Sequence, residues 1–118
     1  MYHYKAVLVR VIDGDTIDVD IDLGFDVWLK KQRIRLAGID APESRTRNKF
    51  EKALGLAAKA RLTELCSEEM QLESLGTGKY GRILGIPKTS DGTSMCQILI
   101  DEGHAVEYSG DKKTKVWA

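Results

Sequence analysis

The stretch Arg35-Leu36-Ala37-Gly38-Ile39-Asp40-Ala41-Pro42-Glu43 joins a strand-like run to a loop that carries two carboxylates. Successive side chains of a strand point to opposite faces, so Arg35 faces away from the side on which Ile34 and Leu36 lie. Pro42 disfavours helix at the residue before it and therefore helps to end the strand. The sequence thus predicts that an arginine and two acidic residues gather where a β-strand ends.

Hydrophobic patterning on either side of this stretch predicts a mainly β protein. Apolar and acidic residues alternate over 17–23, which is typical of a half-buried strand with one acidic face. We expect that acidic face to be solvated, with a metal site as the alternative. Further strand-like runs cover 5–12, 25–29, 31–39, 70–75 and 83–87.

The spacing of apolar residues predicts one main helix over 49–66. The residues at helical spacing are Phe50, Ala53, Leu54, Ala57, Ala58, Leu62 and Leu65. Gly55, inside this helix, either permits close packing against the sheet or costs about 1 kcal/mol relative to alanine. A short second helix is expected over 95–102, with Gly103 following it. Together the elements predict an α+β fold, a small closed β-barrel of the OB type that carries one main helix and a short second one.

Length and charge narrow the class of protein. The chain has 118 residues, which fits a single domain over residues 1–118. Its 18 basic and 18 acidic side chains balance, which argues against a protein that coats nucleic acid non-specifically. The charges are nevertheless segregated, with a net of −4 over residues 1–29 (two basic, six acidic) and +5 over residues 30–52 (eight basic, three acidic). This arrangement suits a metal site beside a groove for a polyanion, although chance segregation of solvated charges would look the same.

Other sequence features concern location and partners. No apolar run approaches the roughly 20 residues of a membrane span, so no membrane contact is expected. The N-terminus shows no secretion signal, which predicts a cytoplasmic protein as written and a secreted one if the chain is a trimmed form. No obligate protein partner is visible, and we expect a monomer. Cys66 and Cys96 stand in apolar contexts and are expected to be buried free thiols.

Side chains able to act on a phosphate are concentrated in a few segments. Carboxylates come from the segment Asp13-Gly14-Asp15-Thr16, from Asp40 and from Glu43. Lys79-Tyr80-Gly81-Arg82 supplies a second arginine besides Arg35. Oxygen donors without nearby cysteine or histidine point to Ca²⁺ or Mg²⁺ and not to zinc. Two arginines can form forked hydrogen bonds with phosphate oxygens. The combination suggests hydrolysis of a phosphodiester; the alternative is structural, with Arg35 and Glu43 as an ion pair and Asp40 as a loop cap.

Several sequence blocks, in this order along the chain, resemble the staphylococcal nuclease (thermonuclease) family. They are Asp13-Gly14-Asp15-Thr16, Arg35-Leu36-x-x-Ile39-Asp40-x-Pro42-Glu43, Gly55-x-x-Ala58, Lys79-Tyr80-Gly81-Arg82 and Leu99-x-x-x-Gly103-x-Ala105. The resemblance implies an OB-like five-stranded barrel with helices. It also implies a calcium-dependent nuclease that cleaves DNA and RNA at the 5′ P–O bond and leaves 3′-phosphates.

The resemblance also implies a role for each matching residue. Asp15 and Asp40 correspond to the metal-ligating carboxylates, and the Ala41 carbonyl corresponds to a backbone ligand. Glu43 corresponds to the residue that positions or deprotonates the attacking water.

The basic and aromatic positions match the family in the same way. Arg35 and Arg82 correspond to the two phosphate-binding arginines, and Lys79 and Tyr80 correspond to substrate contacts. Tyr108 matches a further tyrosine that contacts the nucleotide, with a shift of about one residue in the alignment.

Three features of the sequence depart from the family pattern. Gly78 stands where an aspartate usually precedes the Lys-Tyr-Gly-Arg block, Ala41 stands where threonine is common, and the C-terminal helix is shortened or absent. A backbone ligand should tolerate the change at Ala41. The alternative function is a catalytically silent module of the same fold that binds nucleic acid or protein, and a third reading is an interaction domain without any ligand.

Overall fold

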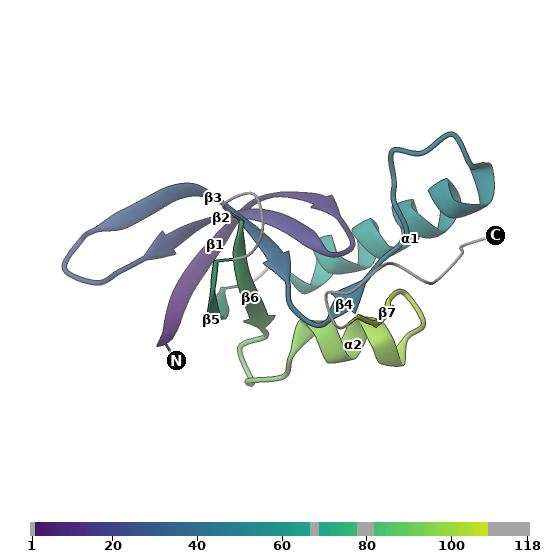
Figure 1. Ribbon diagram of the computed structural model, residues 1–118. Helices are drawn as coiled ribbons and strands as arrows, with labels where there is room; N and C mark the ends of the chain where they lie inside the picture. Colours follow the sequence, from purple (N-terminus) through teal and green to yellow (C-terminus); the bar gives the residue numbers. More distant parts are fainter. Residues whose placement is uncertain (1, 67–68, 78–81, 109–118) are drawn as a thin grey trace.

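Within residues 2–66, 69–77 and 82–108, which the computed structural model describes, five strands close a barrel and two helices lie on one side of it (Figure 1). Around the barrel the strands follow in the order β1 (Tyr2–Asp13), β2 (Thr16–Asp22), β3 (Trp28–Leu36), β6 (Ile83–Lys88) and β5 (Met70–Thr77). The remaining elements are α1 (Lys49–Leu65), α2 (Met95–Asp101) and the short paired strands β4 (Ile39–Asp40) and β7 (Val106–Glu107). The predicted α+β barrel of the OB type is confirmed, and so are the five strands that the family resemblance implied.

A parallel pair of strands closes the barrel. β1, β2 and β3 form an antiparallel meander, and β5 pairs antiparallel with β1 and β6. The closing pair is β3 with β6, in which Ile34 lies opposite Ile83 and Arg35 opposite Leu84. Since β3 belongs to both the meander and the closing pair, Arg35 stands where the two parts of the barrel meet.

Alternating side chains fill the barrel as the sequence pattern predicts. Ile17, Val19 and Ile21 of β2 are at most 4% exposed. Cys66 and Cys96 are buried free thiols, as expected. Burial raises the pKa of Cys66 to about 12 and that of Cys96 to about 11, so both thiols stay protonated at neutral pH and serve as packing.

Helix α1 forms where expected, but its first half does not bury the predicted face. Its N-cap is Asn48, whose side chain accepts the backbone N–H groups of the first turn. The buried residues are Gly55, Ala58 and Leu62, whereas Phe50 is 72% and Leu54 44% exposed. Figure 1 shows the reason: the first half of α1 extends beyond the barrel, so no strand covers its apolar stripe.

Helix α2 also agrees with the sequence. The side chain of Ser94 caps it by accepting the N–H of Gln97, and Gly103 follows its end with a φ of +80°. In the described part of the chain, neither helix has the length and apolar character needed to cross a membrane.

Two predicted strand runs on either side of β3 differ from the structure. The predicted run 25–29 is largely a turn: Phe25 and Asp26 have φ values of +55° and +61°, and β3 begins only at Trp28. The predicted run 31–39 ends at Leu36, because Gly38, with a φ of +78°, turns the chain into β4. Left-handed backbone at non-glycine residues is not visible in hydrophobic alternation, which explains the error at the tip.

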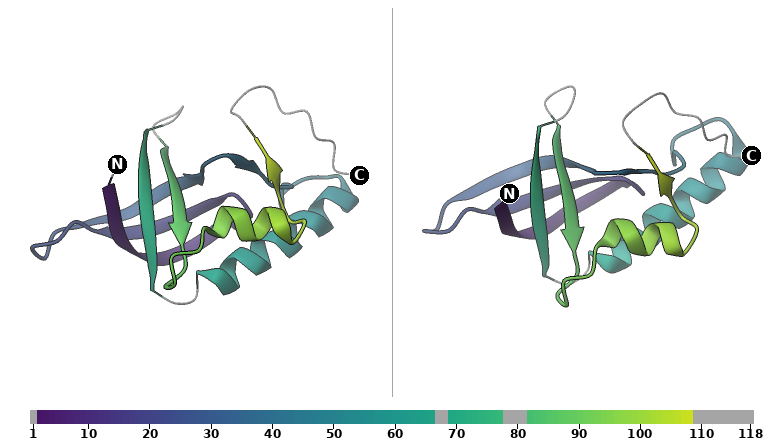
Figure 2. Two further views of the ribbon diagram at one scale, coloured as in Figure 1. Left: turned by 90° about the horizontal axis from the view of Figure 1, so that it is seen from below. Right: turned by 60° about the horizontal axis from the view of Figure 1, so that its bottom comes forward.

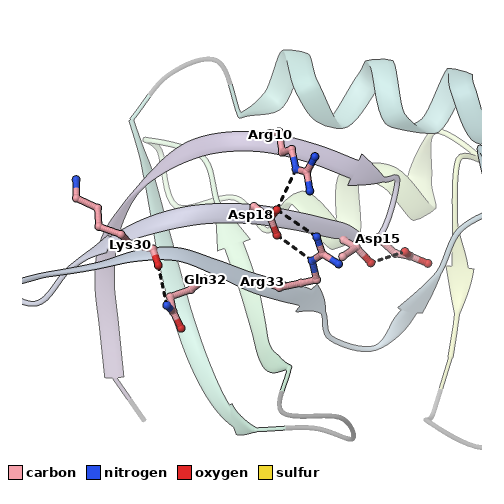
Figure 3. A network of polar contacts seen from close by, with 7 residues as sticks. Arg10, Asp15, Asp18, Lys30, Gln32 and Arg33 are labelled. Atoms are coloured by element: carbon pink, nitrogen blue, oxygen red, sulfur yellow. Dashed lines mark hydrogen bonds and ion pairs between the residues drawn. The ribbon is translucent and has the colours of Figure 1, made fainter.

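The acidic face of β2 is ion-paired, and the prediction of a solvated face is wrong for Asp18. This residue is 7% exposed and accepts hydrogen bonds from Arg33 Nε (2.9 Å) and Arg10 Nε (3.1 Å) on the neighbouring strands (Figure 3). Arg33 first, and then Arg10, hold the pKa of Asp18 below its usual value. Two guanidinium groups therefore cover the carboxylate and compensate for its burial.

Candidate active site

Two acidic segments that are distant in sequence are joined by hydrogen bonds from aspartate side chains. Asp15 Oδ2 accepts the backbone N–H of Ala41 at 2.9 Å, and the Asp13 carboxylate accepts both the N–H (3.1 Å) and the hydroxyl of Ser44. These bonds attach the loop after β4 to the end of β1 and the turn that follows it. One bond lies on each side of Glu43, at Ala41 and at Ser44. The predicted carboxylates are brought to one region of the molecule by these bonds.

Arg35 lies between the two predicted metal-binding aspartates. Its Nη2 is 3.5 Å from Asp15 Oδ2 and 3.8 Å from Asp40 Oδ1. The side chains of Arg35, Asp15 and Asp40 are only 15%, 12% and 10% exposed. Its Nη1 donates to the carbonyl of Leu36 at 2.9 Å, which fixes the guanidinium beside the end of β3. One cation shared by two carboxylates shows that both acids point into the same space.

Tyr108 completes this cluster from the end of the described chain. Its backbone N–H donates to the Gly38 carbonyl at 2.9 Å, just beyond the pairing of β7 with β4. The centre of its ring is 5.9 Å from Arg35 Cζ, within the range of a cation–π contact. The structure therefore places Tyr108 beside Arg35, where the family resemblance implied a contact with substrate.

Glu43 stands apart from the paired aspartates. It is exposed, and its backbone N–H donates to Glu51 Oε2 in the first turn of α1 at 3.0 Å. Among the described residues, Arg35 forms its ion pairs with Asp15 and Asp40, so the alternative of an Arg35–Glu43 pair does not hold there. The carboxylate of Glu43 is thus exposed and lies outside the pair of aspartates that Arg35 contacts.

The second predicted arginine, Arg82, lies beside the strand that carries Arg35. Arg82 is partly exposed and directly precedes β6, one residue before the pair Ile34–Ile83. Continuing that register by one residue brings Arg82 level with Arg33, on the strand that carries Arg35. The predicted contacts Lys79 and Tyr80, and the departure at Gly78, lie outside the described residues.

Small residues let α1 pack tightly against both acidic segments. A Cβ on Gly55 would lie 2.4 Å from the Glu43 carbonyl oxygen, and one on Gly14 would lie 2.6 Å from the Cβ of Ala58. Gly55 therefore permits close packing, the first of the two readings offered by the sequence, although its contact is the loop of Glu43. Sequence reasoning missed this support and the bonds made by Asp13 and Glu51. The glycine inside a helix was the available signal.

Replacing Gly55 with alanine should lower both activity and stability. Helix propensity alone predicts a gain of about 1 kcal/mol for this change, because alanine is the better helix former. The contact with the Glu43 backbone predicts the opposite, since the loop or the helix must move. Thermal melts and kcat for Gly55→Ala, with Leu56→Ala as an exposed control on the next residue, separate the two effects. A raised melting temperature with unchanged kcat would contradict the packing role.

Comparison with known proteins agrees with this geometry. The family model described as staphylococcal nuclease homologue matches residues 33–116, which include Arg35, Asp40 and Glu43. The chain belongs to the staphylococcal nuclease family. The matched segment thus includes the cluster at the end of β3, and Asp15, which precedes the segment, is joined to it by the bond to Ala41.

Relatives of this nuclease homologue include proteins named for cleavage of nucleic acid. The chain is 35% identical over 114 residues to a micrococcal nuclease of Shigella flexneri, covering 89% of this chain and 59% of the relative. It is 38% identical over 116 residues to the endonuclease YncB of Bacillus subtilis, covering 94% and 52%. It is also 38% identical over 82 residues to the protein ParB of Escherichia coli, covering 69% and 40%. The chain spans about half the length of these curated relatives.

The donor set of this staphylococcal nuclease homologue suits a hard cation only with help from other ligands. In the described segments, no group of three or more histidine, cysteine, aspartate or glutamate side chains is able to hold a metal ion, so Glu43 does not form such a group with Asp15 and Asp40. Two converging carboxylates fit Ca²⁺ or Mg²⁺ when waters, a backbone carbonyl and substrate oxygens supply the remaining positions.

Proposed function

We propose that the chain is a calcium-dependent phosphodiesterase, a nuclease that hydrolyses DNA and/or RNA at the 5′ P–O bond and leaves 3′-phosphates. The observation that carries the proposal is the convergence of Asp15 and Asp40 on the guanidinium of Arg35, at 3.5 and 3.8 Å. Two anions and a phosphate-binding cation in one space suit a site that accepts a metal ion together with a phosphate. Membership of the staphylococcal nuclease family supports nuclease chemistry in general.

Asp15, Asp40 and the carbonyl of Ala41 would hold the calcium ion. When bound, the ion would act as a Lewis acid and as a template for the phosphate. Because Asp15 also accepts the N–H of Ala41, the same bond that shapes the loop fixes the orientation of this carboxylate. The protein thereby holds the Asp15 side chain in place before an ion binds.

Arg35 and Arg82 are proposed to bind the phosphate. Guanidinium groups form forked, charge-assisted hydrogen bonds with phosphate oxygens, and these strengthen as negative charge grows in the transition state. Arg35 is nearly buried and already oriented by the Leu36 carbonyl, so little side-chain freedom is lost when substrate binds.

Glu43 is proposed to act on the attacking water. Its carboxylate takes a proton from that water as the water oxygen forms a bond to phosphorus; the bond from phosphorus to the 5′ oxygen breaks, and the 5′ oxygen leaves with the electron pair and takes a proton from solvent water. The backbone of Glu43 is held by Glu51, while its side chain remains exposed and accessible to water.

The second candidate is a catalytically silent module that binds nucleic acid or protein. The observation that favours it is that the described residues contain no metal-holding group of three or more acidic, histidine or cysteine side chains. The presence of Asp15, Asp40, Glu43, Arg35 and Arg82 disfavours it, because a silent module has no need of the complete set.

Cleavage should require a divalent ion, with calcium preferred. We expect purified protein to degrade plasmid DNA and RNA with calcium, to act less well with magnesium, and to stop when a chelator is added. Mass spectrometry of the products should find 3′-phosphate ends. Cleavage that resists the chelator would rule out the metal, and binding of nucleic acid without cleavage under any ion would assign the chain to the silent class.

A further inference from the structure

The outer face of the β2–β3 hairpin exposes cations above buried anions. The side chain of Asp18 is 11% exposed, whereas those of its partners Arg10 and Arg33 are 60% and 46% exposed. The side chain of Asp20 is 22% exposed, and its partner Lys30 is 69% exposed at a distance of 3.5 Å. At the positions of these ion pairs an approaching molecule therefore meets the cations first, although the chain as a whole carries no net charge.

Aromatic side chains follow these cations toward the hairpin tip. Trp28 is 40% exposed, and Lys30 Nζ lies 5.1 Å from the centre of its ring. Phe25 is fully exposed in the turn. Exposed aromatic rings interleaved with cations are the combination that binds single-stranded nucleic acid, because bases stack on the rings while phosphates meet the cations.

The cations and aromatics form one row that starts at the candidate active site. On the outer face, Arg35 lies opposite Thr16, Arg33 opposite Asp18 and Trp28 opposite Asp22. Figure 3 shows Asp15, the Arg10–Asp18–Arg33 cluster and Lys30 following one another along the hairpin. At about 3.3 Å per residue, the strand from Arg35 to Trp28 covers roughly 23 Å.

The hairpin is also free of the helices. Both views of Figure 2 show it extending from the barrel on the side away from α1 and α2. Strand β3 therefore leads from the proposed cleavage site to an exposed tip. OB folds bind about 4 to 16 nucleotides, a length that suits a row of this size.

We propose that the outer hairpin row, defined as Arg10, Trp28, Lys30 and Arg33 with Phe25 at the tip, binds the single-stranded polynucleotide that continues from the phosphate at Arg35. The row gives the site a preference for long single strands over short substrates, because a short substrate bound at Arg35 does not reach the rings and cations of the row. This inference rests on the proposed function for the position of the phosphate at Arg35, whereas binding along the row is measurable without cleavage.

The test compares a 12-nucleotide single strand with a dinucleotide as substrates of the full chain. Trp28→Ala and Lys30→Gln should each lower kcat/KM for the 12-mer about tenfold and leave the dinucleotide unchanged. Lys30→Gln should also reduce the slope of log affinity against log salt by about 0.7, the value for one lost phosphate contact on a single strand. Trp28→Phe, which keeps a ring, should restore most of the affinity, and Lys59→Gln on α1 serves as the charge-matched control.

A second measurement separates this inference from the proposed function. Fluorescence anisotropy with a labelled 12-mer in chelator reports binding even if the chain does not cleave. Weaker binding by Trp28→Ala and Lys30→Gln than by the parent and Lys59→Gln supports the row in either case. Equal binding by all four proteins overturns it, as does an equal loss of kcat/KM on the dinucleotide. Concentration-dependent dimers in sedimentation that disappear in Trp28→Ala would assign the aromatic tip to a second copy and also overturn it.

Discussion

Replacing Arg82 with alanine should lower kcat on DNA by about 10²- to 10³-fold, or roughly 3 to 4 kcal/mol of transition-state stabilisation. The loss should fall on kcat because the phosphate gains negative charge at the transition state, when a guanidinium binds it most strongly. Calcium affinity should change little, since Arg82 is proposed to meet the phosphate and not the ion. Steady-state kinetics and calcium titration by calorimetry measure the two quantities separately.

The other end of β6 offers a matched control for Arg82. Lys88 ends this strand and pairs with Glu73 at 2.9 Å, on the side of the barrel formed by β5 and β6. Lys88→Gln removes one positive charge from the same strand and should leave kcat near the parent value. Unchanged turnover in Arg82→Ala would remove Arg82 from the site, and an equal loss in both variants would show only a dependence on overall charge.

Asp40→Ala should abolish calcium-dependent cleavage, whereas Ala41→Gly should retain most of it. Asp40 is proposed to bind the ion through its carboxylate, so its loss should lower activity on the order of 10²-fold or more. At position 41 only backbone groups take part: the N–H donates to Asp15, and the carbonyl is the proposed ligand. Glycine supplies the same backbone groups.

Calcium titration of both variants decides whether the backbone ligand exists. Ala41 is 2% exposed, so Ala41→Gly also removes a buried methyl group, and a lower melting temperature is expected for that reason alone. The comparison therefore uses calcium affinity and kcat at a temperature where both variants are folded. Equal loss of calcium affinity in the two variants would show that the Ala41 carbonyl is not a ligand.

The site shows where sequence reasoning succeeded and where it failed. The motifs and the family resemblance assigned Arg35, Asp15, Asp40 and Glu43 to one site. In the structure Arg35 lies 3.5 Å from Asp15 and 3.8 Å from Asp40, whereas Glu43 stands apart from this pair. The same reasoning gave Asp13 no role of its own, although its carboxylate accepts hydrogen bonds from Ser44 across the fold. A hydrogen bond between residues 31 positions apart leaves no periodic signal, so it was not predictable from the pattern.

The sequence by itself determined the kind of most elements, because periods of 2 and 3.6 residues follow from the local geometry of strands and helices. It also determined which acids and arginines are available for chemistry. Tertiary structure alone decided which faces are covered: Phe50 stays exposed because α1 extends past the barrel, and Asp18 is buried because Arg10 and Arg33 reach it from both neighbouring strands. Tertiary structure likewise placed Arg35 between Asp15 and Asp40, since the antiparallel register of β2 and β3 sets Arg35 opposite Thr16, next to the turn that carries Asp15. Burial and ion pairing depend on distances between segments far apart in the chain, and local patterning carries no measure of those distances.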